Sequence, residues 1–192
     1  MNQQEIISFN FSSLRNLIDT TLTNESQTIQ TIAKAISSSI IAGGTVFWCG
    51  NGGSAAESQH MAAELIGVFA RKREAYASIA LTTDSSVLTC ISNDFDFDQV
   101  FARQISGLGR KGDILIGISS SGNSRNVNNA ITKARESGIV TISLSGKGGG
   151  GGKGLADYEI VIESESTPRI QEVHTLINHT ICGLVENLVI DA

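Results

Sequence analysis

Hydrophobic positions follow a helical period over the first forty residues. Two apolar stripes with spacings of three and four residues occur there, one through Phe11, Leu14, Leu17 and Ile18 and one through Ile29, Ile32, Ala33, Ile36 and Ile40. The glycine pair Gly43–Gly44 follows the second stripe, and glycine just past the last turn is a common helix terminus. The pattern predicts two helices in residues 1–42, the second of which ends at the glycine pair.

From residue 45 onward, short apolar runs alternate with segments of helical period. The runs are rich in β-branched residues and are Thr45–Cys49, Ser78–Leu81, Asp113–Ser119, Ile139–Leu144 and Tyr158–Glu163. The helical segments are Ser54–Phe69, Ser124–Ser137 and Pro168–Val189. Near-continuous apolar strands that alternate with helices are typical of a parallel sheet covered on both faces. The sequence therefore predicts a single α/β domain over residues 1–192: a three-layer α/β/α sandwich with a five-stranded parallel sheet, with residues 1–42 as additional helices for packing or oligomerisation.

Composition narrows the function classes. The chain of 192 residues is 41% hydrophobic and 17% charged, with a formal net charge of −5, as in an ordinary globular protein. The chain lacks the basic stripe that is typical of nucleic-acid binding. The densest basic cluster, Arg71–Arg73, is predicted to be a solvated loop tip. No run approaches the ~18 apolar residues that a membrane span needs, and the N-terminus has no export-signal pattern.

The cysteines and a glycine-rich segment add two further expectations. Cys49, Cys90 and Cys182 are widely spaced within apolar segments, which favours reduced, buried thiols and a cytoplasmic location. The glycine-rich segment Gly146–Gly154 is predicted to be a flexible loop.

Two predicted strand ends have the composition of anion-binding turns. Gly50–Ser54 follows the first strand and Ser120–Ser124 follows the third, and each opens a helix. Helix N-termini at the carboxyl ends of parallel strands present free N–H groups, and glycine lets a ligand approach the backbone closely. Serine and asparagine can also act only as helix caps here. Because two such turns occur, the pattern favours a phosphate on a small molecule, and neither turn matches a nucleotide-binding motif.

His60 and Glu64 are four residues apart in the helical segment that follows the first of these turns. On a helix this spacing places both side chains on one face. The pair alone is compatible with a surface contact, a buried polar pair, a metal site or an acid–base pair.

Four segments resemble the sugar isomerase (SIS) domain family. They occur in the order CGNGGSAAESQHMAAEL (49–65), SNDF (92–95), GISSSGNSRNV (117–127) and RIQEVHTLINH (169–179). The resemblance covers nearly the whole chain and is strongest to those members that isomerise sedoheptulose 7-phosphate in the synthesis of the heptose of bacterial lipopolysaccharide. It implies the SIS fold and a homotetramer whose active sites lie at subunit interfaces.

The resemblance also assigns residues. It implies that Glu64 and His179 form the acid–base pair, and that one Zn²⁺ per subunit is held by His60, Glu64, Gln171 and His179. It implies substrate contacts by Asn51, Gly52, Gly53, Ser54, Glu64, Asn93, Asp94, Ser119, Ser120, Ser121, Ser124 and Gln171.

These residue types suit an aldose–ketose isomerisation. Such a reaction moves a proton between C1 and C2 through an enediol or enediolate, so it needs a base at carbon and a proton carrier at the oxygens. A partly desolvated Glu64 can serve as the base, and a histidine such as His179 titrates near neutral pH. A bound zinc would stabilise the developing negative charge. Because Glu64 and His179 also belong to the implied zinc site, the sequence leaves open which of the two takes the carbon proton.

Two positions depart from the pattern of the family. Relatives carry arginine at the position of Val68 and aspartate at that of Pro168. Arg71 or Arg73 could replace the missing cation at the substrate. Pro168 also has a structural interpretation, since proline is favoured in the first turn of a helix.

Two other functions are compatible with parts of the sequence. One is a non-catalytic tetrameric SIS scaffold of the type that associates with the DnaA initiator, which lacks equivalents of Glu64 and His179. The other is a sugar-phosphate-sensing module of a transcriptional regulator, which would require a DNA-binding region. Because both Glu64 and His179 are present, the sequence favours the enzyme.

Overall fold

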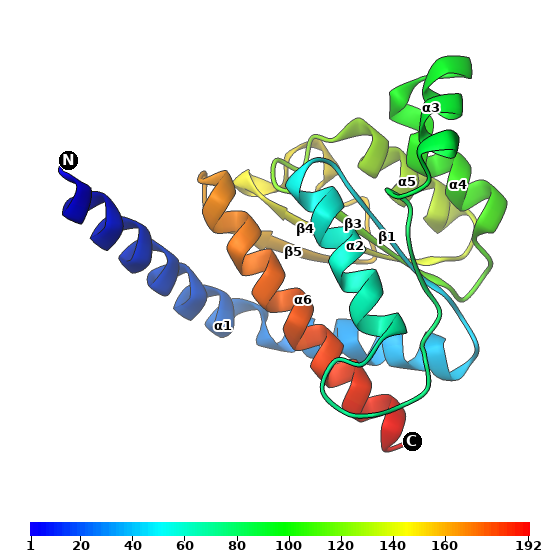
Figure 1. Ribbon diagram of the computed structural model, residues 1–192, viewed down its shortest axis with the longest axis horizontal. Helices are drawn as coiled ribbons and strands as arrows, with labels where there is room; N and C mark the ends of the chain where they lie inside the picture. Colours follow the sequence, from blue (N-terminus) through cyan, green and yellow to red (C-terminus); the bar gives the residue numbers. More distant parts are fainter.

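Five parallel strands form one sheet in the computed structural model, which describes residues 1–192 (Figure 1). They are β1 (Val46–Gly50), β2 (Ser78–Ala80), β3 (Ile114–Ser119), β4 (Val140–Gly146) and β5 (Tyr158–Ile162), in the spatial order β2-β1-β3-β4-β5. Every residue of β1 and β3 is buried, as expected for strands covered on both faces. The predicted five-stranded parallel sheet is therefore confirmed.

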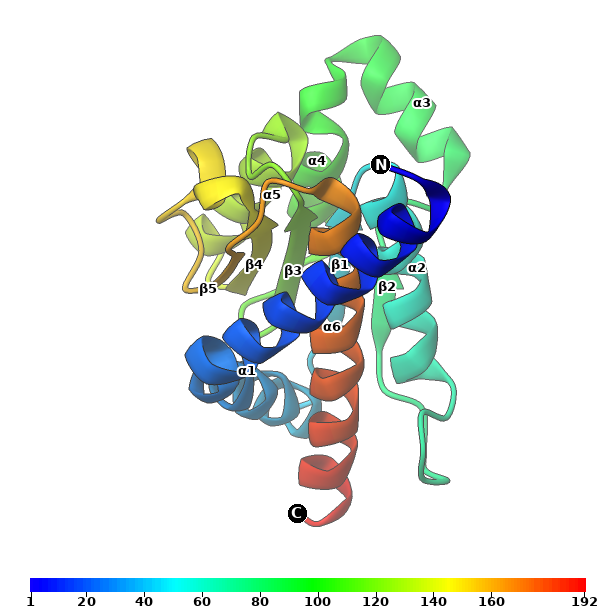
Figure 2. The ribbon, with the colours of Figure 1, turned by 90° about the vertical axis from the view of Figure 1, so that its left-hand side faces the viewer.

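Helices cover both faces of this sheet (Figures 1 and 2). One layer contains α1 (Gln3–Ile41), α2 (Gly53–Ile66) and α6 (Thr167–Ile190), and the other contains α3 (Ser85–Asp94), α4 (Val100–Leu108) and α5 (Arg125–Glu136). Alternate residues of β1 enter the two cores: Val46 and Trp48 pack in the α1/α2/α6 core, and Phe47 and Cys49 in the other. The period of two along a strand explains this division.

The N-terminal region forms one helix and not two. Helix α1 is 39 residues long and runs without interruption from Gln3 to Ile41. The prediction of two helices was wrong because the two apolar stripes were read as separate elements, whereas no glycine or proline lies between them to end the first. Both stripes pack on the same core: Leu17 and Ile29 are buried in it, and Leu14 and Ile18 pack against it. Only the N-terminal end of the helix, residues 1–12, is fully exposed.

Three short helical elements between β2 and β3 were not predicted. They are α3, the 3₁₀ turn η1 (Phe97–Gln99) and α4. Helix α3 buries only Ile91 and projects from the upper end of the molecule in Figure 1. None of the three elements is longer than ten residues, which is shorter than the window of about 11–18 residues over which a helical period is recognised.

One of the cysteine predictions is also corrected. All three thiols are free, and Cys49 and Cys182 are buried, but Cys90 is exposed on α3 with its Sγ 3.4 Å from Oδ2 of Asp94. The apolar residues next to Cys90 in the sequence favoured burial, but of all residues of α3 only Ile91 is buried. None of the helices combines the length and the hydrophobicity needed to cross a bilayer.

Candidate functional site

The two predicted anion-binding turns lie side by side. Strands β1 and β3 are paired in the sheet, with Gly50 opposite Ile118, so the turns that follow them share one edge. Helix α2 starts after Gly52, which has a positive φ of 56°, and α5 starts after Ser124. Neither Gly52 nor Ser124 caps its helix with a side chain.

Some first-turn N–H groups are paired, since Ser54 and Ala55 donate to backbone carbonyls and Val127 donates to Oδ1 of Asn126. The N–H groups that remain for an anion are those of Gly53 on α2 and of Arg125 and Asn126 on α5.

An asparagine pair joins the two turns. The side chains of Asn51 and Asn126 exchange two hydrogen bonds, of 2.8 Å from Nδ2 of Asn51 and 2.9 Å from Nδ2 of Asn126. Asn126 is buried at the start of α5 and was not among the predicted site residues. The sequence placed it within the SIS-like segment 117–127, but only the pairing of β1 with β3 shows what it contacts.

The second turn is organised by its own serines. Ser119 donates from Oγ to Oγ of Ser124 at 2.9 Å, and the backbone N–H of Asn123 donates to Oγ of Ser121 at 3.1 Å. Ser119 is buried, and Ser120, Ser121 and Ser124 are half-buried. The turn thus presents hydroxyl groups in a fixed arrangement beside the N-terminus of α5.

The glycine-rich segment forms hydrogen bonds to this turn and is not a flexible loop. It forms the 3₁₀ element η2 (Lys147–Gly152). Gly152 donates from N to the carbonyl oxygen of Gly122 at 2.8 Å, and Gly151 donates from N to Oδ1 of Asn123 at 2.8 Å. The prediction was wrong because these glycines do not leave the segment without structure. Since they have no Cβ, they let two backbone segments approach each other closely.

We expect the Gly150→Ala substitution to weaken substrate binding. A Cβ on Gly150 would lie 2.5 Å from the carbonyl oxygen of Ser121 and 2.7 Å from Oδ1 of Asn123, so the serine turn must move. A displacement of about 1 Å is enough for a loss on the order of tenfold or more, measured as a rise in the KM for the sugar phosphate. The control is Gly148→Ala, because Gly148 also has a positive φ but meets no atom within 4 Å. Equal KM values for the two variants would contradict this role of the loop.

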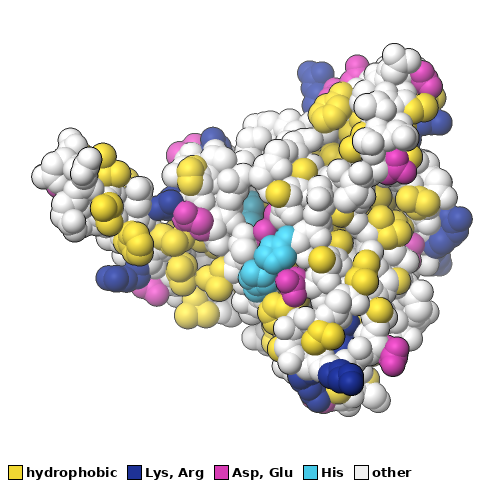
Figure 3. Space-filling model, in the orientation of Figure 1, with side chains coloured by type: hydrophobic (Ala, Val, Ile, Leu, Met, Phe, Trp, Pro, Cys, Tyr) yellow, Lys and Arg dark blue, Asp and Glu magenta, His cyan; other side chains and the backbone are white.

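His60, Glu64 and His179 come together on the α1/α2/α6 face. Nε2 of His60 is 3.2 Å from Oε1 of Glu64 and 3.4 Å from Nε2 of His179. The three donor atoms all lie within 4.8 Å of one another. Figure 3 shows histidine side chains beside an acidic one at the surface of this face. The helical spacing of His60 and Glu64 predicted half of this cluster, and the packing of α2 against α6 supplies the other half.

Gln171 lies on α6 two turns before His179. Its amide packs over the first turn of α2, where a Cβ on Gly53 would lie 2.7 Å from Nε2 of Gln171. Gly53 must therefore be glycine for this amide to lie where it does. The side chain of Gln171 therefore lies against the turn Gly50–Ser54.

Glu57 joins α2 to α6 three residues before His60. Its Oε2 accepts from Oγ1 of Thr175 and its Oε1 accepts from Nδ2 of Asn178, both at 3.0 Å. Oε2 also lies 3.9 Å from Nδ1 of His60. This separation is beyond hydrogen-bond distance, so Glu57 contributes to the cluster by joining α2 to α6 beside His60.

His174 lies apart from the cluster, in the core. It is 1% exposed, and its Nε2 lies 3.1 Å from the carbonyl oxygen of Ser145. Burial lowers the pKa of His174 to about 4, against smaller opposing effects of the Ser145 carbonyl and the Glu57 charge. The imidazole is therefore neutral in the folded protein near neutral pH.

This burial predicts a loss of stability on acidification. Between pH 7 and 5 the unfolded chain gains a proton on His174, whose ordinary pKa is about 6.5, whereas the folded chain does not. We expect the free energy of unfolding to fall by about 2 kcal/mol from this group over that interval, measured by urea denaturation. Because Gln can still donate to the Ser145 carbonyl but does not titrate, the His174→Gln variant should have a shallower slope. An unchanged slope would contradict the assignment.

The structure does not bring Asn93 and Asp94 to the cluster. Both are exposed at the C-terminal end of α3, where Nδ2 of Asn93 donates to Oδ1 of Asp94 at 2.8 Å. This bond and one from Cys90 lower the pKa of Asp94, so its carboxylate is ionised. These two predicted substrate contacts are thus presented outward by a projecting helix.

The basic cluster Arg71–Arg73 does not face the site. Arg71 contacts Asn187 and Asp191 at the end of α6, and the Arg73 side chain is only 3% exposed. The prediction of a solvated tip was therefore wrong for Arg73, because its guanidinium pairs with a buried carboxylate of α6. In the single chain, the guanidinium groups of Arg71 and Arg73 contact α6 and the backbone at the end of α2 and no predicted substrate-binding side chain.

The donor set of the cluster suits a divalent metal. Two imidazoles and a carboxylate within mutual reach are common zinc ligands, and a fourth position open to solvent is typical of a catalytic site. His60 is exposed, and Glu64 and His179 are half-buried, so a ligand can approach the cluster from solvent. The same three groups can also act as acids and bases.

Known proteins are similar to this chain in sequence and in fold. The SIS domain family matches residues 10–146. A phosphoheptose isomerase of Akkermansia muciniphila is 46% identical over 158 residues, which are 82% of this chain and 84% of that protein. One of Aliarcobacter butzleri is 53% identical over 145 residues, covering 76% and 77% of the two chains. The solved structure of a phosphoheptose isomerase from Francisella tularensis superposes with a TM-score of 0.94 at 33% identity, over 97% of this chain and 100% of that one. The chain therefore belongs to the SIS domain family and, within it, to the phosphoheptose isomerases.

Proposed function

We propose that the chain interconverts sedoheptulose 7-phosphate and D-glycero-D-manno-heptose 7-phosphate, the first step towards the ADP-heptose of lipopolysaccharide. The observation that carries this proposal is the convergence of His60, Glu64 and His179 within 4.8 Å. This acid–base cluster lies between two helices, one of which, α2, begins at an anion-binding turn.

The layout suits a sugar whose phosphate is far from its carbonyl group. His60 follows Gly53 by seven residues, which corresponds to about 10 Å along a helix. The phosphate would bind at the turns Gly50–Ser54 and Ser119–Ser124, through backbone N–H groups and serine hydroxyls. The chain of the sugar would then extend past Gln171 towards Glu64, with C1 and C2 at the cluster.

The reaction needs two proton movements. In the ketose-to-aldose direction a base removes a proton from C1, the C1–H electron pair forms the C1=C2 double bond, and the negative charge that develops on O2 is neutralised by a proton, which gives the enediol. The hydroxyl at O1 then loses its proton, and C2 receives one, which gives the aldehyde. In this proposal Glu64 would act at carbon, and His179 would move the proton between O1 and O2. The reverse assignment of these two residues uses the same geometry.

We further propose that one Zn²⁺ per subunit is held by His60, Glu64, Gln171 and His179. When bound, the metal would act as a Lewis acid on the sugar oxygens and stabilise the negative charge of the enediolate. Support comes from the imidazole and carboxylate donors, which lie within 4.8 Å of one another.

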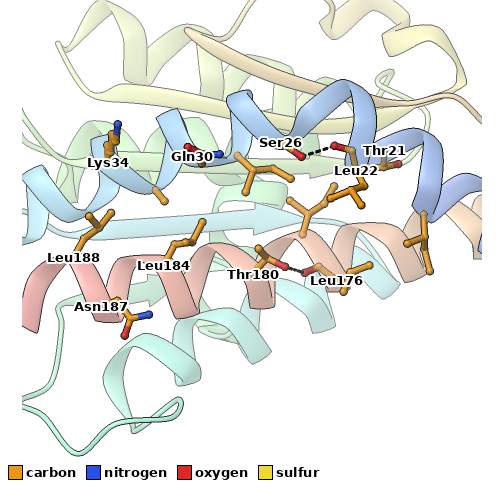
Figure 4. Close-up of a pocket in the computed structure, with 14 residues that line it drawn as sticks. Thr21, Leu22, Ser26, Gln30, Lys34, Leu176, Thr180, Leu184, Asn187 and Leu188 are labelled. Carbon is orange, nitrogen blue, oxygen red and sulfur yellow. Dashed lines mark hydrogen bonds between the residues drawn. The ribbon is translucent and has the colours of Figure 1, made fainter.

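The site would be completed by assembly into a homotetramer. A groove of about 570 Å³ runs between α1 and α6, and its lining includes Leu22, Leu176, Leu184 and Leu188 (Figure 4). Exposed apolar residues of the projecting half of α1, among them Ile6, Ile7, Phe9 and Phe11, provide a face that would fill such a groove on another copy of the chain. Residues 1–42 would thus serve assembly.

A neighbouring copy would also supply Asn93 and Asp94. In one chain these residues point outward on α3 and contact each other, so a second subunit is needed to bring them to a cluster. The protein would act in the cytoplasm, where its substrate and the reduced thiols of Cys49, Cys90 and Cys182 are expected.

Incubation with sedoheptulose 7-phosphate tests the proposal. Nuclear magnetic resonance should show the appearance of an aldose 7-phosphate and, in D₂O, deuterium at the reacting carbons. Treatment with a chelator should reduce the rate, and Zn²⁺ should restore it. Absence of product under all conditions would reject the enzyme and favour the non-catalytic scaffold, whereas a rate unchanged by complete metal removal would reject only the zinc site.

A further inference from the structure

A buried ion pair connects the loop after α2 to the last helix. Nε of Arg73 lies 3.0 Å from Oε1 of Glu186, and the two side chains are 3% and 2% exposed. Arg73 belongs to the segment between α2 and β2, and Glu186 lies on α6 seven residues after His179. The pair therefore joins the two helices that carry the His/Glu cluster.

The Arg73 guanidinium holds the end of α2 directly. It donates from Nη2 to the carbonyl oxygen of Glu64 at 2.8 Å, and from Nη1 to the carbonyl oxygens of Leu65 and Glu74 at 2.9 and 3.0 Å. Its plane also lies 3.9 Å over the ring of Tyr76. One of these contacts thus fixes the backbone of the candidate catalytic carboxylate itself, in the last turn of its helix.

Glu186 holds the rest of the loop. Its Oε2 accepts from the backbone N–H groups of Ala70 and Arg71 at 3.0 and 2.8 Å. Burial alone would raise the pKa of Glu186, but these donors and Arg73 outweigh it and lower the pKa. Both members of the pair are therefore charged, and hydrogen bonds satisfy each of them.

We propose that Arg73 and Glu186 are positioning residues, which set the distance and orientation of Glu64 relative to His179. This inference rests on the proposed function of the His/Glu cluster. A buried ion pair is weak evidence for stability, because the loss of hydration offsets the attraction between the charges. The contacts of this pair instead fix the geometry of the cluster, because they join the backbone of Glu64 to the helix that carries His179.

A second connection lies at the other end of the cluster. Glu57 of α2 accepts from Thr175 and Asn178 of α6, one turn before His60. The cluster is therefore placed between two polar connections, Glu57 on one side and Arg73–Glu186 on the other. Loosening either one should let the two helices shift while the apolar core still holds the fold.

The Arg73→Lys variant tests the inference. Lysine keeps the positive charge opposite Glu186, but its compact ammonium cannot reproduce the planar fork that serves the carbonyls of Glu64, Leu65 and Glu74. Residues that orient metal ligands typically contribute 10–100-fold to metal affinity or activity. We expect kcat to fall by about tenfold or more with little change in KM, and Zn²⁺ affinity, measured by competition with a chromophoric chelator, to fall by about tenfold.

Arg71→Lys is the matched control, because Arg71 also bonds to the end of α6 but from an exposed position; its kcat and Zn²⁺ affinity should equal those of the wild type. A double variant, Arg73→Met with Glu186→Met, removes both charges and leaves none unpaired. It should fold, as judged by circular dichroism, and show the same loss of Zn²⁺ affinity.

The outcomes separate this inference from the proposed function. If the wild type isomerises the sugar and binds Zn²⁺, but Arg73→Lys and the double variant match it in both, the positioning role is wrong. If they lose only thermal stability, the pair is structural and the inference is also overturned. If the wild type itself neither isomerises nor binds Zn²⁺, the proposed function fails and this inference fails with it.

Discussion

Turnover of sedoheptulose 7-phosphate should fall by about 10³-fold or more in the Glu64→Gln variant, because a general base typically contributes 10²–10⁴-fold. Glutamine has nearly the same shape, so the backbone contact with Arg73 and the packing of α2 should persist. It cannot take a proton from carbon, however, and it offers only a neutral oxygen to a metal. We expect the rate of deuterium incorporation at C1 in D₂O to fall in parallel with turnover.

The control for this variant is Glu172→Gln, which makes the same change on α6. Glu172 is exposed and pairs with Arg169, away from the cluster, so its turnover should be that of the wild type. Calorimetry should show that Glu64→Gln still binds the sugar phosphate, because the two serine- and glycine-rich turns are untouched. Turnover above about a tenth of the wild-type value would contradict the role of Glu64.

The second large effect is expected on assembly. The Leu22→Asp substitution places a charge in the groove between α1 and α6, where Leu22 is 66% exposed in the single chain. If another copy covers this groove, the variant loses about 1.5–3 kcal/mol of apolar burial at each copy and must also desolvate a carboxylate. We expect the tetramer to dissociate, as measured by sedimentation or light scattering.

Activity should fall together with the tetramer. Asn93 and Asp94 lie on the projecting helix α3, and a dissociated subunit has no neighbour to supply them. Leu108→Asp is the control, because Leu108 is 49% exposed at the end of α4 and lies outside the groove. A Leu22→Asp variant with the mass and activity of the wild type would show that the groove is not a subunit interface.

Local patterns were sufficient to predict most of the elements. The strands of the sheet are short apolar runs, and their burial on both faces follows from that composition. Helices α2, α5 and α6 begin and end within a few residues of the predicted bounds, because glycine, serine and proline mark helix ends locally. Residues 3–41 form one helix and not two because no residue between the two apolar stripes ends it, and α3 is too short, at ten residues, for its period to predict a helix.

Local sequence was enough to predict the strands, the two glycine- and serine-rich turns and the shared helix face of His60 and Glu64, because each depends on residues close together in the chain. Family resemblance implied that His179 joins this pair, but its contact with His60, the bond between Asn126 and Asn51 and the pairing of Arg73 with Glu186 became visible only in the folded chain. These contacts span 75 to 119 residues along the chain. The physical reason is that long-range contacts depend on how helices pack across a shared core, and the periodicity of one segment does not encode its partner.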